Sequence, residues 1–124
     1  MDFEFILSSY FCSHSEITLR DNKLSRKDRF DKVKSIVTPE TLKLFWEKIK
    51  ALHIDTWDSE YIDDAIFDGT QWELKVKSDF LIKKIVGSNA FPDGGIELDE
   101  TPIFDELIKA VEFLIGEEDF FNLS

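Results

Sequence analysis

The segment Trp72-Glu73-Leu74-Lys75-Val76-Lys77 alternates apolar and charged residues without interruption. Successive side chains of a β-strand point to opposite faces of the sheet, so this period of two predicts a strand with one buried and one hydrated face. We expect the three apolar members in the core and the three charged members in water. A slip of one residue would exchange the two faces, so the pattern also predicts the register.

Turn signals stand on both sides of this strand. Asp68-Gly69 precedes it and Ser78-Asp79 follows it. Residues 80–86 are a second strand candidate, and the two strands together predict a β-hairpin. Residues 87–95 are rich in Gly, Asn, Asp and Pro, which predicts a loop because these residues tolerate unusual backbone angles or favour turns.

The N-terminal part of the chain predicts further strands. Residues 2–7 alternate apolar and polar positions, residues 16–20 form a second candidate, and residues 23–25 would make a short basic edge strand. Residues 26–37 fit two descriptions. Their apolar positions follow either a helical stripe or a strand over residues 33–37, and both interpretations stay open.

Two Thr-Pro pairs predict helix starts, because Thr is a good N-cap and Pro is tolerated at the first helical position. The first helix follows Thr38-Pro39 and should end near residue 53 or 54. The second follows Thr101-Pro102 and should stop at Gly116. Each helix has a single apolar stripe, made of Leu42, Phe45, Trp46, Ile49 and Leu52 in the first and of Phe104, Leu107, Ile108, Val111, Leu114 and Ile115 in the second.

We therefore predict a single α+β domain over residues 1–124, with the order strands, helix, hairpin, helix. Its fold would be an antiparallel β-sheet with two amphipathic helices packed on one face, because each helix has only one stripe to bury. A chain of 124 residues, 43% of them hydrophobic, is long enough to bury such a core.

The formal net charge of −11 is unevenly distributed. Residues 1–52 contain ten Lys or Arg and eight Asp or Glu, whereas residues 53–124 contain five and eighteen. This acidic balance argues against nucleic acid and anionic membranes as ligands. It favours a basic protein partner, or serves only solubility.

Bulk features predict a cytoplasmic protein that does not enter a membrane. The longest apolar stretches, such as residues 80–82, are too short to cross a bilayer. Asp2 and Glu4 stand where a signal peptide would carry positive charge. The single cysteine, Cys12, excludes an internal disulfide and suits a reducing compartment.

Residues 55–68 contain six acids and no Lys or Arg, interleaved with aromatic residues. The spacing of the acids fits no calcium-binding loop, so we predict no metal site. One interpretation is a recognition surface for a basic partner, because Trp and Tyr are enriched at binding hot spots. The other is a hydrated loop held to the core by Trp57 and Tyr61. The candidate partner-binding residues are Asp55, Trp57, Asp58, Glu60, Tyr61, Asp63 and Asp64.

Two patterns suggest catalysis, and each has a simpler interpretation. Asp68 with Glu73-x-Lys75 is similar to a nuclease signature in which carboxylates hold a metal ion and the lysine assists the attacking water. The same strand residues would also form the hydrated side of an amphipathic strand. Cys12 and His14 are close in sequence but have no orienting third group. We predict no catalytic residue and no cofactor, and keep a small metal-dependent hydrolase or nuclease as the alternative.

A longer pattern resembles small bacterial proteins of uncharacterised or immunity-protein type. Asp68-Gly69-Thr70-Gln71-Trp72-Glu73-Leu74 is followed by a hairpin, by Gly87-Ser88-Asn89-Ala90-Phe91-Pro92 and by an amphipathic helix, and the resemblance covers residues 38–115. It implies a small α+β fold and, for the immunity-like members, neutralisation of a toxin by direct binding. The chain departs from the pattern by inserting residues 93–101 between the proline and the helix.

The sequence therefore predicts an acidic protein-binding domain, of the type of an immunity protein that inhibits a toxin. Its acidic half would steer a basic surface towards it, and Trp57, Tyr61 and nearby acids would anchor that surface. A structural or assembly domain with no site of its own is a further alternative.

Overall fold

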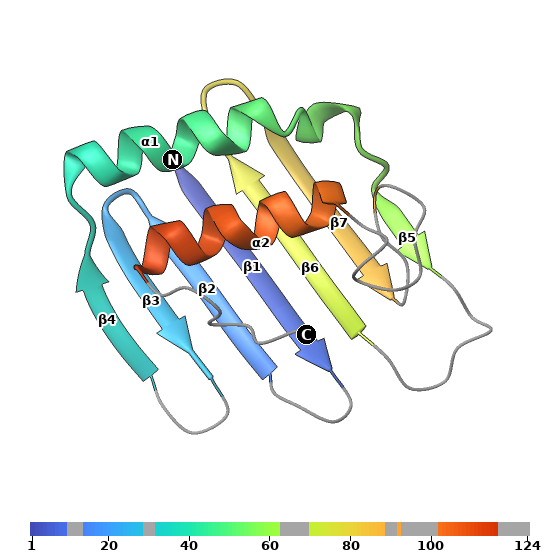
Figure 1. Ribbon diagram of the computed structural model, residues 1–124, viewed down its shortest axis with the longest axis horizontal. Helices are drawn as coiled ribbons and strands as arrows, with labels where there is room; N and C mark the ends of the chain where they lie inside the picture. The colour runs from blue at the N-terminus through green and yellow to red at the C-terminus, as the bar shows by residue number, and fades with distance from the viewer. Residues whose placement is uncertain (10–13, 29–31, 63–69, 89–91, 93–101, 117–124) are drawn as a thin grey trace.

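The computed structural model describes residues 1–9, 14–28, 32–62, 70–88, 92 and 102–116. Their strands form one sheet in the order β4-β3-β2-β1-β6-β7-β5 (Figure 1). Every neighbouring pair is antiparallel except β5 with β7. The strands are β1 (Asp2–Ser9), β2 (His14–Arg20), β3 (Lys23–Lys27), β4 (Lys32–Ile36), β5 (Glu60–Ile62), β6 (Thr70–Lys77) and β7 (Ile82–Ser88). The predicted mixed α+β class is confirmed.

The N-terminal strand β1 lies in the middle of the sheet, between β2 and β6. Phe5 stands opposite Ile17 on β2 and opposite Leu74 on β6, and all three side chains are fully buried. The alternation predicted for β6 is confirmed, because Trp72 and Val76 are buried with Leu74 while the intervening side chains reach water. Burial of this apolar row holds the three central strands in one register.

Helix α1 (Pro39–Ala51) begins as the sequence predicts. The hydroxyl of Thr38 accepts a hydrogen bond from the backbone N–H of Thr41 at 3.3 Å, and Pro39 occupies the first helical position. The helix ends about two residues earlier than expected, because His53 takes a left-handed backbone conformation with φ 52°. A 3₁₀ turn, η1 (Ile54–Thr56), follows.

Helix α2 (Pro102–Ile115) stops where the sequence predicts. Gly116 has φ 76°, and its N–H donates to the carbonyls of Glu112 (2.9 Å) and Phe113 (3.3 Å). A residue without Cβ is well suited to this left-handed position. The buried side of the helix includes Phe104, Leu107 and Val111, which are fully enclosed.

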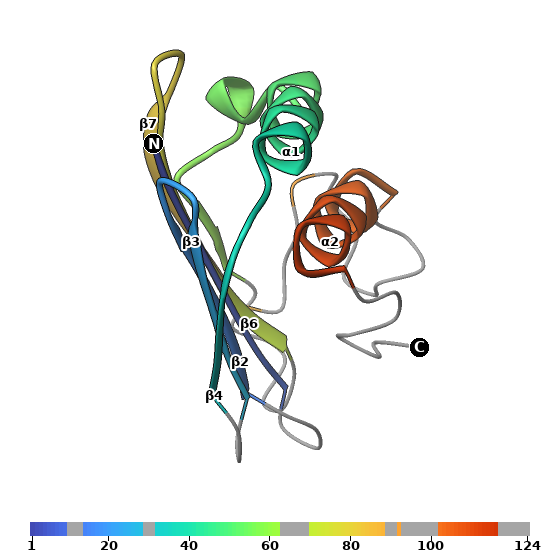
Figure 2. The ribbon, with the colours of Figure 1, turned by 90° about the vertical axis from the view of Figure 1, so that its left-hand side faces the viewer.

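Both helices lie on the same side of the sheet, as Figure 2 shows. The core therefore lies between the sheet and the helices, where Phe3 contacts Phe45 of α1 (ring centroids 5.0 Å apart) and Trp72 contacts Phe104 of α2 (4.9 Å). No described helix covers the opposite side of the sheet. We call that side the open face.

Two parts of the chain differ from the sequence predictions, and the choice left open for residues 26–37 is decided for strands. Where they are described, residues 26–37 complete β3 and form β4. Residues 60–62, expected in a loop, form β5. Strand β7 begins at Ile82 and not at residue 80, because the N–H of Ser78 donates to the carbonyl of Leu81 and closes a turn there.

Candidate functional site

Residues 55–62, which we call the acidic segment, contribute two aromatic side chains to the core. Trp57 is 8% exposed, and Tyr61 is half-buried with its ring stacked on Trp72 at a centroid distance of 6.0 Å. Both rings therefore help to hold this segment to the core. A direct anchoring contact from the Trp57 ring to a partner is not compatible with its burial in this conformation.

Four hydrogen bonds hold the backbone of the acidic segment against the sheet. The ammonium group of Lys83 donates to the carbonyls of Asp55 (3.3 Å) and Trp57. The hydroxyl of Tyr61 accepts from the N–H of Asp58 at 2.8 Å. The Val86 N–H donates to the carbonyl of Ser59 at 3.0 Å. The segment is therefore attached at several points along residues 55–61.

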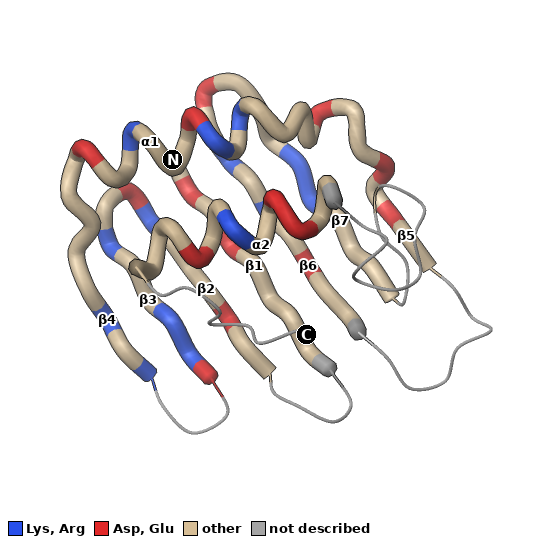
Figure 3. The backbone as a smooth tube through the Cα atoms, viewed as in Figure 1, with Lys and Arg blue, Asp and Glu red and all other residues tan. Residues whose placement is uncertain are grey.

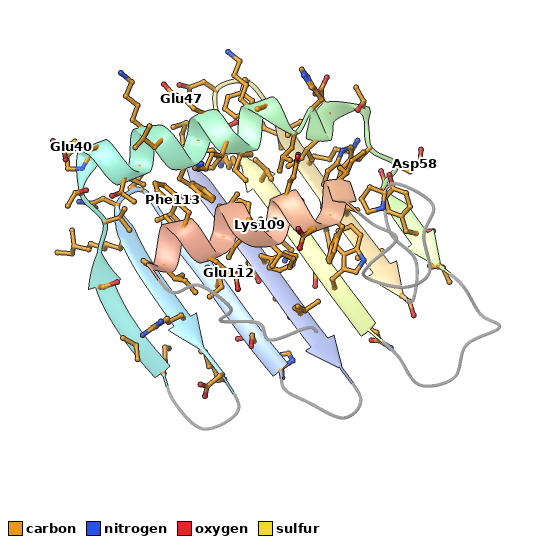
Figure 4. All side chains as sticks on the ribbon, viewed as in Figure 1. Glu40, Glu47, Asp58, Lys109, Glu112 and Phe113 are labelled. Atoms are coloured by element: carbon orange, nitrogen blue, oxygen red, sulfur yellow. The ribbon has the colours of Figure 1, made fainter. Side chains whose placement is uncertain are left out.

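The carboxylates of Asp55, Asp58 and Glu60 point into water from this fixed backbone. Within the residues that the structure describes, none of the three forms an ion pair. Asp58 lies at the end of the molecule next to β5 (Figure 4). Three candidate partner-binding residues are thus exposed within residues 55–60, while Asp63 and Asp64 lie outside the described residues.

Glu73 and Lys75 of the nuclease-like pattern form an ion-pair cluster with Lys84 on the open face. The Glu73 carboxylate lies 3.6 Å from the ammonium of Lys75 and 3.4 Å from that of Lys84. Asp68 lies outside the described residues. Among those that are described, no group of three or more His, Cys, Asp or Glu side chains could hold a metal ion.

A row of hydrogen-bonded polar side chains joins the C-terminal end of β1 to the N-terminal end of β2. The Ser8 hydroxyl and Nδ1 of His14 are 2.7 Å apart, and Nε2 of His14 is 2.9 Å from a carboxylate oxygen of Glu16. This hydrogen bond is the main reason that the pKa of Glu16 lies below its ordinary value. Ser8 and His14 are direct partners in the strand register, so strand pairing alone accounts for their contact. Cys12 lies outside the described residues.

The open face carries a concentration of cations that the sequence analysis missed. Side chains opposite each other in register share a face, so the residues that alternate with the buried ones all point to the open side. Figure 3 shows Lys and Arg positions along β3, β4 and β7 and acidic positions around β5. The cations of the open face are Arg20, Lys23, Lys27, Lys32, Lys34, Lys75, Lys77 and Lys84, against the acids Asp2, Glu4, Glu16, Glu60 and Glu73.

The signal for this surface was present in the sequence. Lys32 and Lys34 alternate on one strand, and Lys75 and Lys77 alternate on another. Summing charge over halves of the chain hides such a face, because a strand distributes its residues between two sides. Summing charge by strand face would have revealed it.

The comparisons with known proteins add no relative. No protein-family model matches the chain, and neither the curated proteins nor the solved structures yield a match. The resemblance to immunity-type proteins therefore stays a prediction. Neither helix in the described part of the chain is long and apolar enough to cross a membrane.

Proposed function

We propose that the chain is a protein-binding domain without catalytic activity, and that it inhibits a toxin in the manner of an immunity protein. The observation that carries this proposal is the acidic segment beside β5. Its backbone is fixed to the sheet while Asp55, Asp58 and Glu60 stay exposed and unpaired among the described residues.

The role of Lys83 supports a binding surface at this position. Its ammonium group donates to two backbone carbonyls of the segment, so it fixes the backbone without forming an ion pair with the neighbouring carboxylates. A surface that is already ordered loses less conformational entropy when a partner binds. Exposed charges that face a complementary surface raise the association rate by long-range attraction.

The proposed mechanism gives the aromatic residues a positioning role. Trp57 and Tyr61 would hold the segment from the core side, and the carboxylates would contact a basic surface of the toxin. Asp63 and Asp64 follow directly in the sequence and would extend the charge. The partner would associate more slowly at high salt, because ions screen such attraction over about 8 Å at physiological strength.

Stopped-flow association tests the proposal, after the partner has been captured from the source cell. The triple variant Asp55→Asn, Asp58→Asn, Glu60→Gln should associate about tenfold more slowly at low salt. The matched control, Glu40→Gln, Glu47→Gln, Glu106→Gln, makes the same charge change on the helices, where Figure 4 places Glu40 and Glu47 well away from Asp58. Equal rates for the two triple variants would contradict the acidic segment as the binding surface.

The alternative functions make different predictions. A hydrolase or nuclease that uses Asp68, Glu73 and Lys75 would lose Mg²⁺-dependent cleavage of DNA or RNA in the variant Glu73→Gln. The contacts of Glu73 with two lysines favour a structural role for this carboxylate. A structural or assembly domain would show neither cleavage nor a salt-dependent partner.

A further inference from the structure

We propose that the open face over β2, β3 and β4 is a second interaction surface, which binds an acidic segment of a partner protein. A shallow hollow of about 560 Å³ lies there. The described residues that line it include four cations and no carboxylate, namely Thr18, Arg20, Lys23, Leu24, Ser25, Lys32, Lys34, Ser35 and Ile36. A net charge of −11 for the whole chain gives no reason to expect such a local excess of positive charge.

The strand register places like charges directly opposite each other. Arg20 on β2 stands opposite Lys23 on β3, and Lys27 on β3 stands opposite Lys32 on β4. Like charges in such positions destabilise a sheet. A bound anionic segment would relieve this repulsion, which is a physical reason to expect a ligand at the surface.

Acids at neighbouring register positions compensate only part of this charge, since Asp2 stands opposite Arg20 and Glu16 stands opposite Lys27. Arg20, Lys23, Lys27, Lys32 and Lys34 are all exposed, and none forms an ion pair with another described residue. The lysines at the opposite end of the sheet differ, since Lys75 and Lys84 share the carboxylate of Glu73. The surface over β2–β4 is therefore the more cationic part of the open face.

Protection of a sheet edge explains only part of this pattern. Lysines on an edge strand discourage pairing with other chains, and β4 is an edge of the sheet. That role accounts for Lys32 and Lys34. It does not account for Arg20, Lys23 and Lys27, because β2 and β3 are inner strands with neighbours on both sides.

The residues around the hollow favour a protein over a nucleic acid as the occupant. Ile36 lies at its margin with 74% of its surface exposed, which offers an aliphatic contact. None of the described residues that line the hollow is aromatic, whereas surfaces that bind single-stranded nucleic acid use aromatic rings to stack bases. The three strands together are about 10 Å wide, so an extended peptide that crosses them would place roughly three residues over the surface.

Fluorescence anisotropy with defined probes tests this inference on the full-length chain. The main probe is a labelled ten-residue peptide that alternates Glu and Leu. Two comparison probes are the same peptide with Gln in place of Glu and a labelled twenty-nucleotide oligo-dT. We expect the Glu peptide to bind at low salt, to weaken steeply as salt rises, and to bind more tightly than either comparison probe.

A pair of charge-matched variants locates the binding. Lys23→Gln, Lys32→Gln, Lys34→Gln should weaken binding of the Glu peptide about tenfold. Lys43→Gln, Lys48→Gln, Lys50→Gln removes the same charge from α1 and should change it less than about twofold. The first variant should keep or raise the melting temperature, because it removes like-charge repulsion. Retained melting temperature therefore shows that any lost binding does not come from unfolding.

Four results would overturn the proposal. They are no binding of the Glu peptide by the wild-type chain, equal weakening in the two variants, tighter binding of oligo-dT than of the Glu peptide, and a dimer of the wild-type chain that the first variant abolishes. The third result would make the open face a nucleic-acid surface. The fourth would make a second copy of the chain its occupant.

Discussion

The indole ring of Trp72 occupies the space that a side chain on Gly87 would need. The two residues are direct partners in the pairing of β6 with β7, and a Cβ atom on Gly87 would overlap the indole nitrogen. Trp72 is 3% exposed and packs against Tyr61 and Phe104. Glycine at position 87 thus allows the largest side chain of β6 to lie flat over the neighbouring strand.

The substitution Gly87→Ala should lower the free energy of unfolding by about 1–3 kcal/mol, because the added methyl group must displace a well-packed ring. Urea denaturation followed by tryptophan fluorescence measures this loss. The variant Ser88→Ala, one residue further on β7, should lose less than about 0.5 kcal/mol, as most partly exposed substitutions do. Equal stability of Gly87→Ala and wild type would show that Trp72 is packed differently.

Shortening one buried side chain on either helix should strongly destabilise the chain. Phe45 on α1 and Leu107 on α2 are both fully buried. Replacing each by alanine should cost about 2–5 kcal/mol, because the lost contacts and the remaining cavity both count. Thermal or urea unfolding would measure the cost. A loss below about 1 kcal/mol at both positions would mean that the helices contribute little to the core.

The parts of the fold that the sequence predicts correctly are those with a local physical signal. The alternation of residues 72–77 needs only one hydrated and one buried face. The start of α1 at Thr38-Pro39 and the end of α2 at Gly116 depend on backbone groups within a few residues. Each of these signals depends only on residues close in sequence and not on the position of distant parts of the chain.

The features that the sequence analysis missed depend on contacts between distant residues. Strand β5 has three residues and forms because it pairs with β7, with Glu60 opposite Val86. The apolar positions of residues 26–37 left a helix and a strand both open, and pairing of β3 with β2 and β4 decides for strands. The alternating lysines of the open face are visible in the sequence, but their gathering over neighbouring strands is set by the alignment of those strands. No local pattern contains that alignment.

The hydrogen bond from His14 should control the pKa of Glu16. The pKa of Glu16 lies below 4.5 mainly because of this bond, with partial burial opposing the shift and the charges of His14, Lys27 and Lys32 adding to it. Because the folded pKa is depressed, the stabilising contribution is complete above about pH 4.5 and is lost as pH falls through the folded value.

NMR titration of the Glu16 carboxyl carbon checks this relationship. His14→Ala should raise the pKa of Glu16 towards 4.5, and Lys27→Gln should raise it less, because Lys27 is a smaller cause of the shift. The free energy of unfolding should then change less between pH 3 and pH 5 in His14→Ala than in wild type. An unchanged Glu16 pKa in His14→Ala would show that the hydrogen bond is not formed in solution.

Lys83 and Lys84 are adjacent on β7 and point to opposite faces of the sheet, which makes them a matched pair for substitution. Lys83 donates to the carbonyls of Asp55 and Trp57, whereas Lys84 pairs with Glu73 on the open face. Lys83→Met keeps the aliphatic stem and removes both hydrogen bonds to the acidic segment. It should cost about 1–3 kcal/mol, because the part-buried carbonyl of Trp57 and the exposed carbonyl of Asp55 both lose a charged donor.

The same change should also loosen the acidic segment locally. Amide hydrogen exchange should become faster at Asp58 and Val86, whose N–H groups take part in the hydrogen bonds that hold the segment. Lys84→Met should leave both amides protected, because an exposed ion pair contributes little to stability. If the captured partner binds this segment, Lys83→Met should also weaken its binding, because the segment would then have to be ordered on association. Unchanged exchange at both amides in Lys83→Met would mean that Tyr61 and β5 pairing hold the segment without the lysine.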